Sequence, residues 1–456
     1  MPASPSTARA INDRLALRLL QQEGPLTAGR LKQLTGLSRP TVADLVERLT
    51  AAGLIAVVGE AGEQRRGPNA KVYGIVADRA HLAALDVRTE GVSVAVADLV
   101  GRVLAEASVP IGGDTGTGPA VEQAVMLVER AAKEAGAHRL HTVGIGAPGL
   151  IDPSSGELRD STGLPEWHRR LVATLQERLP EARVSVENET NLAALAEQRD
   201  GAARDRDTFV LLWLGHGTGA AVVLDGALRR GASGGTGEIG FLPVPGTSAL
   251  PTSTDCEGGF HSLAAAAAVV DLAVECGVAV AAGQEPSTVG VVRAAAAMVR
   301  EAVGRVPCAT PPGRPDGVPC VTPPGRPDGV PCVTPPGRPD GVPEVAARAS
   351  SSGDSGPAFR FLDALADRIA VGVASVVAIL DPGCVVLGGE VGQAGGGCLA
   401  ARVQDRIARM TPLPTEVRAT TLGGGAVLRG ALLRARDRAQ EELFTPGERV
   451  PQPPPG

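Results

Sequence analysis

Aromatic residues, lysine and long apolar runs are all scarce in this chain of 456 residues. Aromatics make up 2% of it, so a core has to be built from Leu, Val, Ile and Ala. Three of the 44 basic residues are lysines (Lys32, Lys71, Lys133), an excess of Arg that we interpret as GC-rich coding. The longest apolar run, Ile369 to Leu380, has 12 residues. A bilayer needs about 20, so no membrane association is expected.

The N-terminal sequence MPASPSTARA lacks the apolar segment of a secretory signal. The seven cysteines are odd in number and show no CxxC spacing, which argues against a disulfide framework and against a zinc ribbon. We therefore expect a cytoplasmic protein without a metal or another cofactor. At roughly 100–200 residues per domain, the length allows two to four domains.

The net charge of −6 conceals an asymmetry. Residues 1–80 hold 11 Lys and Arg against 7 Asp and Glu, a charge of +4, which leaves −10 for the remainder. A small basic unit on a large acidic body favours nucleic-acid binding at the N-terminal end. Ordinary surface variation explains +4 over 80 residues equally well, so charge alone does not decide.

A 12-residue unit, VPCVTPPGRPDG with one variant, occurs three times in succession over residues 306–341. Its Val and Cys stand between prolines and offer no apolar face to stack, so the repeat cannot build a core. We predict an extended or disordered insert there, and disordered ends over residues 1–10 and 445–456. Function is therefore sought outside these three segments.

Residues 11–75 predict a winged helix-turn-helix. Asn12 to Gln22 has leucines at helical spacing, Thr27 can cap a second helix, and Ser38 can cap a third. Residues 54–59 and 71–75 read as two short strands around a basic, Gly- and Pro-containing loop. Three helices followed by two strands are the pattern of a helix-turn-helix with a wing.

The start of a recognition helix enters the major groove of DNA, and a wing reaches phosphate or the minor groove. Arginine reads guanine through two hydrogen bonds, while hydroxyls suit phosphate or base contacts. The predicted DNA contacts are Ser38, Arg39, Pro40, Thr41, Arg65, Arg66 and Lys71. A docking module with a solvated basic loop is the alternative.

Residues 81–110 predict a meander of strands around a turn at Glu90-Gly91, and alternating helices and strands follow. Two Gly-rich turns, each at the end of a predicted strand, favour two α/β lobes with a ligand cleft between them. The motifs in order are GIGAPGLID (144–152), ENETNLAALAE (187–197), GHGTGAAVVLDGALRRGASGGTGEIG (215–240) and VVLGGEVG (385–392). Together they resemble the ROK family (repressors, open reading frames and sugar kinases), which implies an actin-like ATPase fold.

On the sugar side, the family's kinases use an Asn-Asp pair, with the Asp as general base, and a Glu of the GEIG motif. The resemblance places Asn188, Glu189 and Glu238 at these positions. Glu189 replaces the Asp, and its extra methylene displaces the carboxylate by over an ångström, which can cost about a hundredfold in rate. Gly163 of GLPEW stands where the family has a ligand Asn. These four residues are the predicted sugar contacts; the alternative is that they only pack the lobes together.

The residues implied for zinc are replaced. The family's His after GEIG is Phe241, and of its zinc cysteines only Cys256 stands downstream. We therefore expect no metal.

On the nucleotide side, the family's first phosphate turn reads D-x-G-G-T, where glycines let backbone N–H groups approach phosphates. Here Asp86 and Val87 are followed by Arg88, Thr89 and Glu90, so both glycines are lost. The second turn, Gly217-Thr218-Gly219, survives as a vestige. We therefore predict no catalytic residues and no kinase activity.

The prediction is an α/β protein with a winged helix-turn-helix (11–78) and a two-lobed, ROK-like, actin-like ATPase body (79–444) interrupted by the repeat. We expect a homodimer or a dimer of dimers that binds double-stranded DNA at a near-palindromic operator. We expect the protein to act as a repressor of carbohydrate metabolism genes and to respond to a sugar or sugar derivative. The alternatives are an ATP-dependent, glucokinase-like sugar kinase with a fused DNA-binding domain and a constitutive DNA-binding protein with a dead cleft.

Overall fold

The computed structural model describes residues 5–61, 69–152, 154–159, 164–247, 249–278, 290–294, 297 and 356–444. The 12-residue repeat and the segment 445–456 lie outside the described residues. Among the helices that are described, none is long and apolar enough to cross a membrane.

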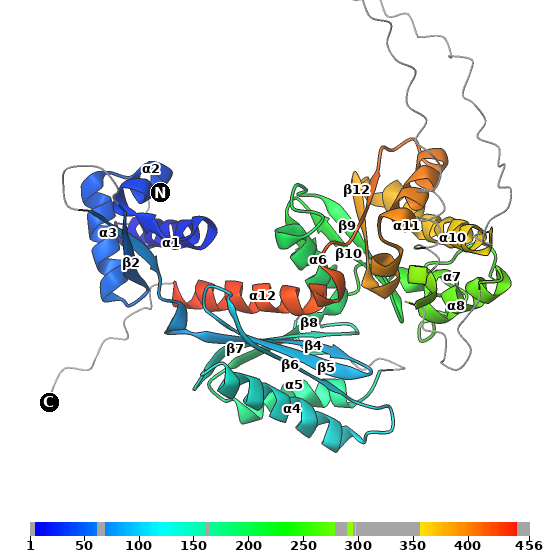
Figure 1. The fold of residues 1–456 in the computed structure, drawn as a ribbon, viewed down its shortest axis with the longest axis horizontal. Coiled ribbons are helices and arrows are strands. Elements are labelled where there is room, and N and C mark those ends of the chain that lie inside the picture. The colour runs from blue at the N-terminus through cyan, green and yellow to red at the C-terminus, as the bar shows by residue number, and fades with distance from the viewer. Residues whose placement is uncertain are drawn as a thin grey trace, which may run out of the picture.

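The N-terminal unit contains three helices and a three-stranded sheet in the order β1-β3-β2 (Figure 1). Thr27 accepts a hydrogen bond from the Arg30 amide and Ser38 from the Thr41 amide, so both predicted helix caps are confirmed. The elements are α1 (Pro5–Glu23), β1 (Leu26–Thr27), α2 (Ala28–Thr35), α3 (Arg39–Ala51), β2 (Ile55–Ala61) and β3 (Ala70–Ile75). The strands β2 and β3 form the predicted wing.

Helix α1 begins at Pro5 rather than at Asn12, so the prediction of disorder over residues 1–10 is wrong for residues 5–10. Ala8, Arg9 and Ala10 are strong helix formers and extend the helix. Pro5 fits at the first helical position because no N–H is needed there.

The first lobe of the body is a five-stranded sheet in the order β6-β5-β4-β7-β8. Helices α4 and α5 cover one face of this sheet and α12 the other (Figure 1). The predicted strand meander is confirmed as β4 to β6. The elements are β4 (His81–Arg88), β5 (Gly91–Asp98), β6 (Val103–Pro110), α4 (Thr117–Glu134), β7 (Leu140–Ala147), α5 (Trp167–Arg178) and β8 (Arg183–Asn188).

The second lobe repeats that topology, with the order β11-β10-β9-β12-β13. Helices α10 and α11 pack against each other, and α11 covers β9, β12 and β13. The elements are β9 (Phe209–Leu214), β10 (Thr218–Leu224), β11 (Ala227–Arg229), α7 (His261–Ala264), α8 (Ala266–Glu275), α10 (Gly356–Leu380), β12 (Cys384–Gly388), α11 (Gly389–Met410) and β13 (Glu416–Ala419). Two sheets of equal strand order make the predicted two-lobed body.

Two helices join the lobes. Helix α6 (Glu189–Asp200) follows the first sheet but packs on β9 and β10 of the second, whereas α12 (Ala426–Leu443) follows the second sheet but packs on β4 and β7 of the first. They touch at Gly430, where any Cβ would overlap the Leu192 carbonyl of α6. A Cβ at Gly144 of β7 would lie 2.7 Å from the Ala431 carbonyl. Helix α12 is therefore in backbone contact with both neighbours.

We expect Gly430→Ala to lower the free energy of unfolding by roughly 1–3 kcal/mol, the usual cost of overpacking a filled core. The measurement is chemical denaturation of the full chain. The matched control is Gly397→Ala in α11, where a Cβ meets nothing within 4 Å. That variant should change the free energy of unfolding by no more than about 0.5 kcal/mol, since Gly397 is exposed and directly follows Gly396, where the backbone of α11 leaves the helical conformation. Equal stabilities of the two variants would contradict the close packing.

Candidate functional site

The first turn of α3 presents the predicted DNA contacts to solvent. Ser38, Arg39 and Pro40 are exposed, and Thr41 is half-buried. The Ser38 hydroxyl caps the helix and lies 2.7 Å from the Thr41 hydroxyl. The opposite face of α3 is buried in the unit's core through Val42, Leu45, Val46 and Leu49. The helix is anchored by one face while its beginning stays free for a partner.

An ion pair fixes α3 relative to α1. The Arg48 guanidinium of α3 lies 2.6 Å from the Asp13 carboxylate of α1 and also pairs with Asp44. Asp44 therefore has a cationic partner on its own helix, and its charge is partly balanced beside the DNA-facing turn.

The wing is described only in part. Lys71 is exposed on β3. The predicted contacts Arg65 and Arg66 lie outside the described residues, as does the predicted sugar contact Gly163.

Asn188 ends β8 and caps α6. Its side-chain oxygen accepts hydrogen bonds from the amides of Thr190 (2.9 Å) and Asn191 (3.2 Å). Its amide nitrogen donates to the Gly149 carbonyl (3.1 Å) and to the Glu189 carboxylate (2.9 Å). Capping thus fixes the Asn188 amide, which in turn positions the Glu189 carboxylate at the helix start.

Glu189 and Glu238 form an acidic pair between the lobes. Burial raises the pKa of the half-buried Glu189 to about 8, and the charges of Glu238 and Asp86 raise it further than Arg88 lowers it. Glu238 is exposed, but partial desolvation among its neighbours raises its pKa as well. The structure therefore brings Asn188, Glu189 and Glu238 together, next to the altered phosphate turn.

Arg88, which the resemblance places at the first glycine of the phosphate turn, pairs with carboxylates of both lobes. Arg88 donates to the Asp86 carboxylate through Nε (3.1 Å) and Nη2 (3.0 Å), and through Nη1 to Glu390 of α11 (2.5 Å). Nη2 also approaches the Gly424 carbonyl, 3.4 Å away. Burial raises the pKa of Asp86 and the ion pair with Arg88 opposes that rise. Arg88 therefore ties the first lobe to the second.

The second glycine turn lies against Glu390 and α6. A Cβ at Gly215 would overlap the Glu390 carboxylate, and one at Gly219 would lie 3.5 Å from the Thr190 hydroxyl. The Oε2 atom of Glu390 and the Thr218 hydroxyl are buried without a hydrogen-bond partner. The Glu390 carboxylate thus contacts both Arg88 and the turn at Gly215.

Glu390 was missed by the sequence analysis, although it lies inside the VVLGGEVG motif. Arg88 and Glu390 are 302 positions apart. The available signal was a complementary pair of charges: an Arg in one glycine turn and a Glu directly after the strand-end glycines of the other lobe.

The histidine, cysteine and carboxylate side chains in the described part of the chain do not form a metal site. Among the described residues, no group of three His, Cys, Asp or Glu side chains could hold a metal ion. His168 is buried, packs edge-on against Trp167 with ring centroids 4.3 Å apart, and burial lowers its pKa to about 4. His216 is exposed. His168 is therefore a packing residue and His216 a surface residue.

The sequence profile of the ROK family matches residues 82–273 and 343–438, which is more than half of the chain. The chain belongs to the ROK family. The profile of the MarR family matches residues 11–67, the winged-helix unit that precedes the ROK body. Fold class and family are therefore as predicted.

Curated relatives of this ROK protein include repressors. It is 25% identical over 240 residues to the xylose repressor of Caldicellulosiruptor bescii, covering 52% of this chain and 59% of that protein. It is 27% identical over 244 residues to the DNA-binding transcriptional dual regulator NagC of Escherichia coli, covering 52% and 58%. The chain thus spans somewhat under two thirds of these relatives.

Solved structures share the fold. A ROK family transcriptional regulator, described as a homologue of the E. coli MLC protein, has a TM-score of 0.67 at 19% identity over 96% of this chain and 98% of its own. A ROK family glucokinase from Streptomyces griseus has a TM-score of 0.56 at 22% identity, covering 78% of this chain and all of its own. Because the match to the regulator extends over nearly the whole chain, it includes the winged-helix unit as well as the body.

The acidic pair of Glu189 and Glu238 predicts that the stability of the folded protein depends on pH. The folded protein keeps a proton on Glu189 up to a pKa of about 8, whereas the ordinary value is 4.5. Between these values the folded state binds more protons than the unfolded state, so raising the pH lowers stability. We expect Glu189→Gln to remove this loss. The Tm of the variant minus the Tm of the unsubstituted protein should therefore increase as the pH is raised from 5 to 8.5. Scanning calorimetry across this range tests it.

Glu106→Gln, at an exposed glutamate of β6, is the matched control. Its Tm difference from the unsubstituted protein should not change with pH. A constant difference for Glu189→Gln as well would mean that Glu189 titrates normally.

Proposed function

We propose that this ROK protein is a sequence-specific DNA-binding transcriptional regulator, a repressor, that responds to a sugar or sugar derivative held by its ROK body. The observation that carries the proposal is the combination of two features in one chain. The first turn of α3 is exposed on an anchored helix, and Arg88, which the resemblance places in the phosphate turn, forms an ion pair with Glu390 of the other lobe.

The polar groups between the lobes support a sugar as the ligand. Asn188, Glu189 and Glu238 offer amide and carboxyl groups that can hydrogen-bond several hydroxyls. A protonated Glu189 can donate as well as accept, which suits a neutral polyol. Relatives that are named repressors of xylose and N-acetylglucosamine systems support the same class of ligand.

The second candidate is an ATP-dependent sugar kinase. A carboxyl with a pKa of about 8 favours it, because a general base works best near neutral pH. Against it stand Arg88, whose guanidinium is paired with Asp86 and Glu390 where the family's kinases have a glycine, and Glu390, whose carboxylate would repel a polyphosphate. We therefore assign the body to binding and not to catalysis.

A dimer follows from how such regulators read DNA. Two recognition helices related by a two-fold axis match two half-sites of a near-palindromic operator about one helical turn apart. We propose a homodimer, or a dimer of dimers, acting in the cytoplasm.

We expect Arg39→Ala to weaken binding to the selected operator by about 1–3 kcal/mol and to relax specificity at one base pair, because the guanidinium reads a base edge. The operator is first obtained by selecting bound duplexes from random DNA, and affinities are measured by gel shift at fixed salt. Arg139→Ala, on the exposed surface of the first lobe, is the control and should bind as the unsubstituted protein does. Equal affinity of Arg39→Ala would remove α3 as the reading helix.

A panel of D-xylose, D-glucose, N-acetyl-D-glucosamine and their phosphates, with and without MgATP, separates the candidates. We expect at least one sugar to raise the Tm, and Glu238→Gln to weaken its binding by roughly tenfold or more through loss of a charge-assisted hydrogen bond. Glu106→Gln should bind normally. Turnover that disappears in Glu189→Ala would establish the kinase instead, and no Tm shift with any sugar would favour a constitutive DNA-binding protein.

A further inference from the structure

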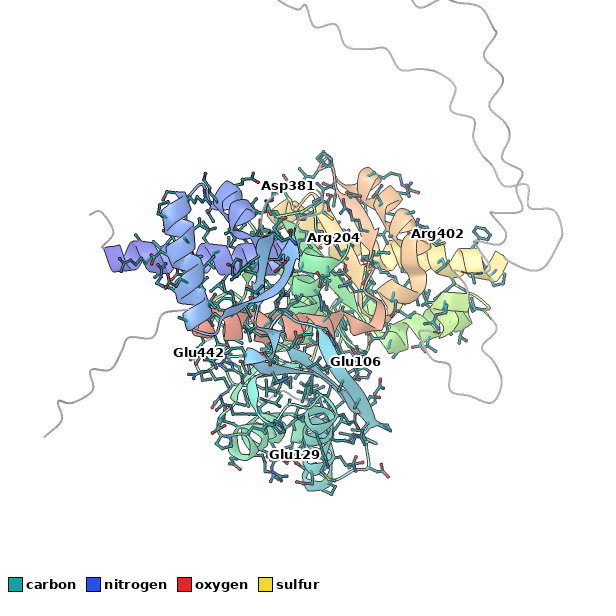
Figure 2. All side chains as sticks on the ribbon, turned by 60° about the vertical axis from the view of Figure 1, so that its left-hand side comes forward. Glu106, Glu129, Arg204, Asp381, Arg402 and Glu442 are labelled. Atoms are coloured by element: carbon teal, nitrogen blue, oxygen red, sulfur yellow. The ribbon has the colours of Figure 1, made fainter. Side chains whose placement is uncertain are left out.

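Helix α12 runs from the interlobe residues to the winged-helix unit (Figure 1). It begins directly after Gly425, and the neighbouring Gly424 carbonyl faces the Arg88 guanidinium. Its last turn contacts α1 through Gln440, 2.8 Å from Gln21, and Glu441, 3.9 Å from Arg14, whereas Glu129 of α4 lies on the far side of the first lobe in Figure 2. Its 18 residues span about 27 Å at 1.5 Å per residue, so one rigid element connects both regions.

A buried amide junction holds the far end of α12. Gln440 is 9% exposed, and its amide nitrogen donates to the Gln21 side-chain oxygen of α1 (2.8 Å) and to the Leu99 carbonyl (2.9 Å). Gln21 in turn donates to the Val100 carbonyl (3.2 Å). The junction thus joins α12, α1 and the turn after β5, three segments that are far apart in the sequence.

The surroundings of this junction are charged and open to solvent. A cavity of about 750 Å³ lies between α1, α6 and α12, lined among others by Arg14, Arg18, Arg199 and Asp437. The Arg199–Asp437 pair in its wall is 47% and 39% exposed. Exposed ion pairs contribute little and are screened by salt. The orientation of α1 on the body therefore depends on the buried amides and the apolar residues around them.

The connection continues inside the winged-helix unit. Gln21 and Asp13 both lie on α1, and Asp13 holds Arg48 of α3. A displacement of the α12 end is thus passed through Gln440 and Gln21 to α1, and through Asp13 and Arg48 to the recognition helix. At its other end α12 cannot move independently of the lobes, because Gly430 is in backbone contact with α6.

We propose that Gln440 is the positioning residue that couples ligand binding between the lobes to the orientation of the DNA-reading helix. The inference rests on the proposed function and extends it to a named residue. Ligand that rearranges α6 and the Arg88 contacts moves α12 as a rod, and the Gln440–Gln21 amides carry that movement into α1. Gln440 contacts neither DNA nor ligand.

The test is the ratio of operator affinities with and without a saturating sugar, using whichever of D-xylose, D-glucose or N-acetyl-D-glucosamine binds the unsubstituted chain. Couplings between sites are typically about 5–150-fold. We expect Gln440→Ala to reduce the ratio to below about twofold while sugar affinity, measured by calorimetry, stays within about twofold. Gln22→Ala is the matched control: this exposed neighbour on α1 lines the same cavity and should keep the full ratio.

Gln21→Ala removes the junction from the other side and is used if Gln440→Ala does not fold, because Gln440 then keeps its bond to Leu99. It should reduce the ratio in the same direction. A full ratio in a folded Gln440→Ala or Gln21→Ala variant overturns the coupling role and leaves the proposed function intact. An unsubstituted protein that binds operator but responds to no sugar overturns both, and this outcome is visible before any variant is made.

Discussion

The backbone contact between α6 and α12 is the constraint on which the arrangement of the body depends. Each helix leaves one sheet and packs on the other, so neither lobe can turn without moving both helices. Contact at Gly430 allows no side chain between them, and close-packed interfaces of this kind shift between discrete arrangements rather than deforming continuously. A ligand that contacts Asn188 or Glu189, at the start of α6, therefore acts on α12 as well.

In the proposed regulator, the Arg88 contacts lie where the resemblance to the family's kinases implies a phosphate turn. Glycines in a phosphate turn expose backbone amides to a polyphosphate. Here Arg88 supplies a positive charge and Glu390 a negative one. These charges are paired with each other by side chains of the protein itself. Transition-state chemistry is not needed for regulation. What is needed is a difference in ligand affinity between two lobe arrangements, because that difference limits the coupling.

The winged helix and the sheets were predictable because their signals are local. Thr27 and Ser38 act as caps within four residues of their partners, and β4 and β5 are neighbours in the sequence that pair across the turn at Glu90-Gly91. The start of α1 was misplaced because the alanines and Arg of its first turns carry no apolar stripe. The site was predictable only in part: motif positions identified Asn188 and Glu238. The Arg88–Glu390 pair joins residues 302 positions apart and needs the folded lobes.

The kind of bond at the Gln440 junction matters for a DNA-binding protein. DNA affinity falls steeply with salt because phosphate contacts release counterions. Ion pairs at the domain junction would weaken over the same range of salt and loosen the coupling together with the binding. The neutral amides of the buried Gln440 and the half-buried Gln21 do not titrate and are little affected by ionic strength. In the proposed regulator, salt can therefore tune how tightly the operator is held, while the step from α12 to α1 is carried by the neutral amides of Gln440 and Gln21 and the step from α1 to α3 by the Asp13–Arg48 ion pair.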